Sequence, residues 1–146
     1  NLMMALKNNR GFFHALIYKY STDEVDRVKE LAKLIKLNQV LSKIAGELSH
    51  GQKQWLEIGM LLAQDPSLLL VDEPAAGMTD SERTETALLL RELSKSRSVI
   101  VVEHDMDFIR QLNCKVTVLN EGSVLAEGSL GHVSKDRNVI EVYLGR

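Results

Sequence analysis

The sequence lacks several features that mark other classes of protein. Cys114 is the only cysteine, so no disulfide can form within the chain, which fits a reducing compartment. No apolar run approaches the roughly 18–20 residues of a membrane-spanning helix, and no basic-then-apolar leader opens the chain. The 18 basic and 20 acidic side chains leave no positive excess for a polyanion. We therefore expect no nucleic-acid partner, and contact with a membrane only through another protein.

A phosphate-binding P-loop of the form G-x-x-x-x-G-K-[ST] is also missing from these 146 residues. Proline occurs only as Pro66 and Pro74, and there is no internal repeat or low-complexity tract. The length is that of about one domain, which can bury roughly 70% of the surface exposed by its unfolded chain. The organisation must therefore be inferred from the periodicity of the apolar residues.

The first 20 residues predict one or two short helices around Gly11. They contain four of the six Phe and Tyr residues of the chain, namely Phe12, Phe13, Tyr18 and Tyr20. Such a cluster is either part of a core or a surface for a partner, and both interpretations stay open.

Three helix starts carry the spacing of a capping box, in which a Ser or Thr and a Glu or Gln three residues later satisfy each other's backbone N–H groups. Ser21 with Glu24 precedes a predicted helix over 22–36. The other pairs are Ser49 with Gln52, before a helix that stops at Asp65-Pro66, and Thr79 with Glu82, before a helix over 80–94.

Two apolar runs, 68–71 and 98–102, predict strands buried on both faces. A helix over 105–113 follows, then a hairpin whose strands, 116–119 and 124–126, flank Asn120-Glu121-Gly122-Ser123. Two short helices are expected after Ser129. The order predicts an α/β fold with a parallel sheet, preceded by an all-helical segment.

Polar residues follow both predicted buried strands, and the carboxyl ends of parallel strands are where ligands bind. Asp72 can hold a hydrated magnesium ion, and Glu73 can orient or deprotonate a water. His104 can donate a hydrogen bond to a phosphate. The alternatives are a capping Asp with a solvated Glu, and a capping or surface histidine.

The segment Ser49-His50-Gly51-Gln52 opens a helix, and helix starts present free N–H groups and a positive dipole end to anions. Ser49 adds a hydroxyl, Gly51 permits close approach of the backbone, and Gln52 can both cap and donate. The alternative is an ordinary capping box with nothing bound.

In this order, the motifs resemble those of the nucleotide-binding subunit of an ABC transporter. Residues 48–52 are similar to the signature sequence, 68–73 to the Walker B strand, 76–80 to the D-loop, and His104 to the switch histidine. The resemblance covers only the C-terminal part of such a subunit, and implies that the P-loop and glutamine loop lie upstream of Asn1. It implies a partial P-loop NTPase sheet over 65–146, and an N-terminal helical subdomain over 1–64.

The resemblance also implies a function, cofactors and partners. ATP and Mg²⁺ would be bound, with Glu73 and His104 catalytic, Asp72 holding magnesium through water, and Ser49, His50, Gly51 and Gln52 contacting the ATP of a second ATPase subunit. The implied partners are transmembrane permease subunits, that second subunit and, indirectly, an extracytoplasmic solute-binding protein. The implied location is peripheral, on the cytoplasmic face of the inner membrane. The chain alone is expected not to hydrolyse ATP. We expect that it either self-associates through strand edges left open beside a missing P-loop strand or is a remnant of a longer protein.

The C-terminal segment, 126–128 with 139–145, is similar to the tail of branched-chain amino acid importer ATPases. Within that group, 48–57 and 103–106 look most like the urea-importer ATPase. Alternatives are a lipopolysaccharide-export ATPase, a non-transport ABC ATPase and a pure interaction module. Two departures from the family pattern are His50, where glycine is usual, and Thr79, where Asp or Asn is usual.

Overall fold

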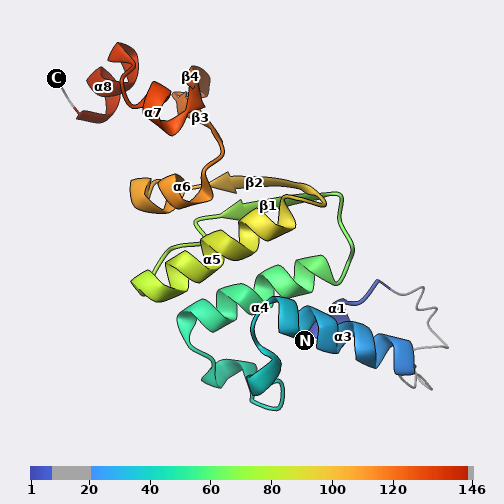
Figure 1. Cartoon of the computed structure of the whole chain (residues 1–146). Coiled ribbons are helices and arrows are strands. Elements are labelled where there is room, and N and C mark those ends of the chain that lie inside the picture. The colour runs from blue at the N-terminus through green and yellow to red at the C-terminus, as the bar shows by residue number, and fades with distance from the viewer. Residues whose placement is uncertain (8–20, 145–146) are drawn as a thin grey trace. The chain divides into compact units, whose positions relative to one another are not determined.

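The computed structural model describes residues 1–7 and 21–144, which belong to two compact units, 1–102 and 103–146 (Figure 1). Most of the aromatic N-terminal segment lies outside the described residues, and so do the helices predicted around Gly11 and the predicted aromatic surface. The two units are defined by contacts between residues. The predicted division into a helical subdomain, 1–64, and the C-terminal part of an ATPase core, 65–146, follows the family resemblance and stays a prediction.

The first unit begins with helices that pack on one another. They are α1 (Leu2–Ala5), α3 (Thr22–Leu34) and α4 (His50–Leu62), with short 3₁₀ helices η1 (Asn38–Val40) and η2 (Ala45–Glu47) between α3 and α4. Gly59 lets α3 and α4 approach closely, because a Cβ there would lie 2.4 Å from Cδ1 of Ile35. Ile35 is fully buried and Leu62 almost so, so the interface between these helices forms the core of the helical segment.

The predicted capping box at the start of α3 is present. The N–H of Glu24 donates to Oγ of Ser21 over 3.2 Å, and the N–H of Ser21 donates to Oε2 of Glu24 over 2.8 Å. These bonds satisfy two helix-start N–H groups that have no partner within the helix. Lys33 in the last turn complements the negative end of the helix dipole.

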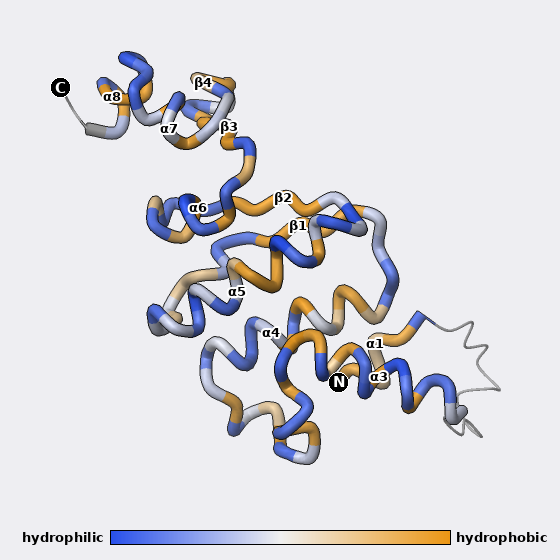
Figure 2. Tube along the Cα trace, in the orientation of Figure 1, coloured by the Kyte–Doolittle hydropathy of each residue, from blue (hydrophilic) through white to orange (hydrophobic). Residues whose placement is uncertain are grey.

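The sheet of the first unit has two parallel strands, β1 (Leu68–Asp72) and β2 (Ser98–Val102), connected through α5 (Asp80–Leu93) (Figure 1). Leu70 pairs with Ile100, and Asp72 with Val102. Figure 2 shows apolar colouring along both strands. The α/β class and the parallel pairing predicted from the sequence are confirmed.

Burial of these strands differs from the prediction. Leu69 is 2% exposed, but its neighbour Leu70 is 65% exposed. The register places Leu70 on the same face of the sheet as Ile100 and Val102, which are 51% and 61% exposed. The expected burial on both faces is therefore wrong within the first unit, because none of its described residues covers this second face.

The second unit contains α6 (Met106–Leu112), β3 (Lys115–Asn120), β4 (Ser123–Ser129), α7 (Leu130–Val133) and α8 (Arg137–Leu144). β3 and β4 form the predicted antiparallel hairpin. Glu121 and Gly122 both have positive φ, 47° and 76°, as the two central residues of a type I′ turn require. The hydroxyl of Tyr143 donates to the carbonyl of Leu119 over 3.0 Å, which fastens α8 to β3.

Within the described residues, no helix is both long and apolar enough to cross a membrane.

Candidate functional site

The start of α4 is held by the capping box that the sequence predicts. The N–H of Gln52 donates to Oγ of Ser49 over 3.2 Å, and the N–H of Ser49 donates to Oε1 of Gln52 over 3.1 Å. The Ser49 hydroxyl also donates to Oε1 of Glu82 over 3.1 Å. The polar atoms of Ser49 are therefore already oriented by protein groups from two helices.

Glu82 is the third residue of α5 and forms the capping box of that helix with Thr79. Its Oε2 accepts from the N–H of Thr79 over 3.0 Å and from the Thr79 hydroxyl over 2.9 Å. Its own N–H donates to Oγ1 of Thr79 over 3.3 Å. One carboxylate thus uses one oxygen for the start of α5 and the other for the start of α4.

Gly51 makes this arrangement possible by its lack of a side chain. A Cβ on Gly51 would lie 2.6 Å from both Cδ and Oε1 of Glu82, closer than real Cβ contacts allow. Gly51 is buried beneath that carboxylate. The glycine of the predicted anion-binding segment therefore admits a protein carboxylate.

The electrostatics of this junction favour the charged form of Glu82. Hydrogen bonds from the backbone and side chain of Thr79 lower its pKa most, and the Ser49 hydroxyl and the nearby His50 lower it further, while partial burial acts in the opposite direction. Two helix starts, each the positive end of a dipole, lie on either side of this carboxylate.

His50 contacts the loop that follows the acidic pair. Its Cδ2 and Nε2 lie 3.1 and 3.3 Å from the position that a Cβ would take on Gly77. Gly77 has φ of +67°, in the left-handed region that glycine adopts without strain. The extra side chain at position 50 therefore packs against Gly77 of the predicted D-loop.

Asp72 is the last residue of β1, and Glu73 follows it with φ of 45°. A left-handed conformation is uncommon for a residue with a side chain, and such outliers occur often at functional sites. The N–H of Glu73 donates to the carbonyl of Val102 over 2.9 Å, so the end of β2 helps to hold it. Both acidic residues are exposed, as ligands and bases for an incoming substrate would be.

His104 belongs to the second unit, in the turn before α6. The neighbouring Glu103 has a side chain only 3% exposed, and its Oε2 accepts from the N–H groups of His104 and Asp105 over 2.9 and 3.2 Å. The same oxygen lies 3.8 Å from Nδ1 of His104, whose side chain is 77% exposed. Glu103 thus shapes the turn that presents the predicted switch histidine.

The structure brings the signature-like segment together with the loop after β1, through Glu82 and Gly77. Asp72 and Glu73 lie together at the end of β1, while His104 is described with the other unit. Prediction from the sequence missed Glu82 and Glu103 as site residues. Spacing identified Glu82 as a capping residue, but its bond to Ser49, 33 residues away, has no signal in the sequence.

The donor set for a metal is small. Among the described residues, no group of three His, Cys, Asp or Glu side chains could hold an ion. Magnesium in nucleotide sites commonly uses one or two protein carboxylates together with water and substrate phosphates. The exposed carboxylate of Asp72 at a strand end fits that use.

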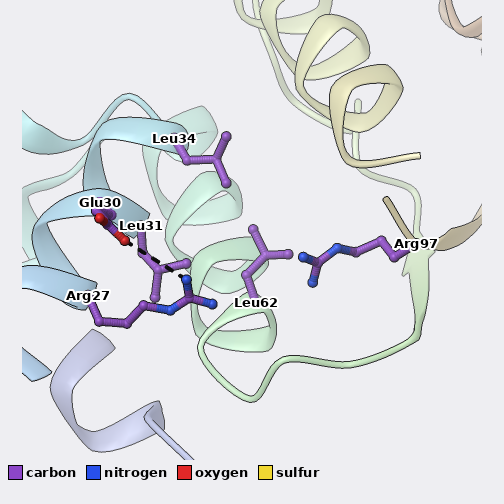
Figure 3. A pocket seen from close by; sticks show the side chains of 6 residues that line it. All are labelled: Arg27, Glu30, Leu31, Leu34, Leu62 and Arg97. Atoms are coloured by element: carbon purple, nitrogen blue, oxygen red, sulfur yellow. Dashed lines mark ion pairs between the residues drawn. The ribbon is translucent and has the colours of Figure 1, made fainter. Parts of the chain in front are cut away.

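Two hollows in the first unit lie apart from these residues. One of about 220 Å³ is lined by Arg27, Glu30, Leu31, Leu34, Leu62 and Arg97 (Figure 3). The guanidinium groups of Arg27 and Arg97 approach Leu62 in this hollow. Nη1 of Arg27 lies 4.0 Å from Oε2 of Glu30. The other, about 160 Å³, is mainly apolar and is lined by residues that include Leu2, Val28, Leu41, Leu48 and Leu56. Leu48, the first residue of the signature-like segment, lines the second hollow, whereas Ser49, Asp72 and Glu73 line neither.

A family model described as ABC transporter matches residues 2–76. The high-affinity branched-chain amino acid transport ATP-binding protein BraF of Pseudomonas aeruginosa is 33% identical over 113 residues, covering 76% of this chain and 44% of BraF. The probable branched-chain amino acid transport ATP-binding protein LivG of Archaeoglobus fulgidus is 30% identical over 150 residues, covering 99% of this chain and 58% of LivG.

Solved structures agree with this similarity. The ADP conformation of an ATP-binding cassette of an ABC transporter matches with a TM-score of 0.78 and 26% identity, covering 99% of this chain and 63% of that chain. The chain therefore spans about half the length of the curated relatives it matches, 44% of BraF and 58% of LivG.

Proposed function

The chain belongs to the ABC transporter family, and we propose from this that it serves as part of an ATP-binding and ATP-hydrolysing subunit of an importer. The observation that carries the proposal is the acidic pair at the end of β1. Glu73 has a left-handed backbone and an N–H bonded to Val102 over 2.9 Å. The family match supports nucleotide as the substrate of that pair.

In the proposed reaction, each site residue has a separate task. Glu73 orients the attacking water and accepts its proton, since a positioned base contributes about 10² to 10⁴ in rate. Asp72 holds Mg²⁺ through water, and the ion neutralises charge on the phosphates when bound. His104 donates a hydrogen bond to the γ-phosphate.

The start of α4 acts on a second nucleotide in this proposal. Ser49, His50, Gly51 and Gln52 face ATP held by another ATPase subunit, where the positive end of the helix dipole favours phosphate. We propose that the P-loop is supplied by another segment or subunit. The helical segment meets permease subunits at the cytoplasmic face of the inner membrane, and a solute-binding protein acts on the far side.

The proposed base is tested by Glu73→Gln in the assembled transporter that contains this chain. The amide keeps the size of the side chain but cannot accept the proton. We expect steady-state ATP hydrolysis to fall by at least about 10²-fold, with binding of Mg-ATP retained in an equilibrium assay. Hydrolysis at the wild-type rate would contradict the assignment of Glu73.

Glu92→Gln is the matched control. It removes a carboxylate from an exposed position on α5, where Glu92 pairs with Lys95 over 2.5 Å. Exposed pairs of this kind contribute little to stability, so hydrolysis should stay at the wild-type rate. Equal losses in both variants would point to general damage to the subunit.

For the solute, we propose a branched-chain amino acid, which the curated relatives support, or urea, which the contexts of residues 48–57 and 103–106 support. Uptake of labelled leucine and labelled urea by vesicles containing the transporter separates the two. Transport of neither, with ATP hydrolysis intact, would contradict both solutes and leave the ATPase assignment standing.

A further inference from the structure

The starts of α4 and α5 are joined by side chains at two levels. Ser49 contacts Glu82 over 3.1 Å, and one to two turns further along, Nε1 of Trp55 donates to Oγ1 of the fully buried Thr86 over 2.8 Å. Both helices therefore run in the same direction, side by side (Figure 1). Their positive ends are neighbours, an arrangement that an unshielded pair of dipoles would oppose.

The carboxylate of Glu82 offsets that opposition. It accepts one hydrogen bond from α4 and two from Thr79, and bonds to an ionised acceptor are roughly twice as strong as neutral ones. It also rests on Gly51 at a distance that leaves no room for a Cβ. His50 adds a third contact, against Gly77.

We propose that Glu82 is a positioning residue, which holds the signature-like start of α4 and the loop after Asp72-Glu73 as one rigid piece. This inference rests on the proposed function, because its consequence is for catalysis. Glu73 would serve one nucleotide and Ser49 another, and Glu82 makes the backbone of both segments move together. Movement of the loop upon hydrolysis is then transmitted to the helix start that contacts the second nucleotide.

The link that Glu82 makes between the starts of α4 and α5 is tested on the full chain without nucleotide. Glu82→Ala should raise amide hydrogen exchange at Gln52 and Lys53, in the first turn of α4, by at least about tenfold, although the substituted residue lies on α5. Glu85→Ala is the matched control, since Glu85 is on the same helix and pairs with Lys36 over 3.2 Å. It should leave exchange at those two amides unchanged.

A conservative variant separates hydrogen bonding from helix capping in general. Glu82→Gln can still accept from Thr79 and can donate to Ser49, so it should restore most of the protection. A Glu82→Gln chain that exchanges as fast as Glu82→Ala would overturn the assignment to these hydrogen bonds. Should Glu82→Ala fail to fold, Ser49→Ala removes the bond between the helices together with the cap of α4, and leaves the box between Thr79 and Glu82 in place. Unchanged exchange at the start of α5 in that variant would overturn the link.

The positioning role is tested in the assembled transporter by kinetics. We expect Glu82→Ala to lower kcat at least about tenfold, with KM for ATP changed less than about threefold, because misplacement of a helix start costs orientation more than binding. Glu82→Gln should recover most of kcat, and Glu85→Ala should match the wild type. If the wild-type transporter hydrolyses ATP and Glu82→Ala has the same kcat, the positioning role is overturned and the proposed function stands. A wild-type transporter that hydrolyses no ATP overturns the proposed function and the positioning role, while the exchange data still decide the link.

Discussion

The start of α3 and the paired starts of α4 and α5 use the same local motif in different surroundings. At α3, Ser21 and Glu24 bond to each other's backbone, three residues apart. At α5, Glu82 completes an equivalent box with Thr79 and also accepts from Ser49, 33 residues earlier. A capping box can therefore stabilise one helix start or also join two helices, depending on which residues lie beside it.

The strongest test of the joint is the buried contact below it. Trp55 is 7% exposed and donates to Thr86, so Trp55→Ala should lower the free energy of unfolding by about 3–5 kcal/mol. Denaturant unfolding of both proteins measures the change. Trp55→Phe keeps an aromatic ring and loses the donor, so it should cost less. A loss in Trp55→Ala no larger than that of a surface substitution would show that the two helices do not depend on this contact.

The next test fills the space beneath Glu82. In Gly51→Ala, the new Cβ would lie 2.6 Å from the carboxyl group of Glu82, so the carboxylate must move away from Ser49. Because the carboxyl group is the far end of a flexible side chain, the cost is that of the displaced hydrogen bond to Ser49, about 0.5–1.5 kcal/mol. Gly46→Ala is the matched control, because nothing lies within 4 Å of a Cβ there. Equal stability of the two alanine variants in thermal unfolding would contradict the close approach of Glu82 to Gly51.

A smaller effect is expected when the capping boxes of Ser21 and Ser49 are each removed. Ser21→Ala and Ser49→Ala should each cost about 1 kcal/mol through loss of a cap. Amide exchange should separate them: Ser21→Ala changes only the first turn of α3, whereas Ser49→Ala also changes the first turn of α5. Purely local changes in both variants would make the two boxes equivalent.

The smallest effect is a pH dependence of stability. Because the pKa of Glu82 is lowered from its ordinary value of 4.5 in the folded chain, its charged form stabilises the fold above that value, and this contribution is lost as pH falls through the folded pKa. The stability difference between wild type and Glu82→Gln should therefore be present near about pH 6 and shrink below pH 4.5. Denaturant unfolding across that range measures it. A difference that grows on acidification would have the wrong sign.

Much of the fold was predictable because its signals are local. The three boxes, the run 98–102 and the hairpin turn at Glu121-Gly122 depend on residues a few positions apart. Burial was less predictable. The sequence predicts that Leu68 and Leu70 belong to a strand buried on both faces, yet they are 45% and 65% exposed. Burial depends on which other segments cover that face.

The candidate site divides in the same way. The sequence alone determined its components: an acid pair at a strand end, a helix start at Ser49 and a histidine after the next strand. Only the tertiary structure decided that Glu82 bonds to Ser49, that His50 packs against Gly77 and that Glu73 takes a left-handed backbone. The physical reason is that capping and periodicity act over three or four residues along the chain. Contacts between α4 and α5 exist only after folding has brought distant segments within hydrogen-bond distance.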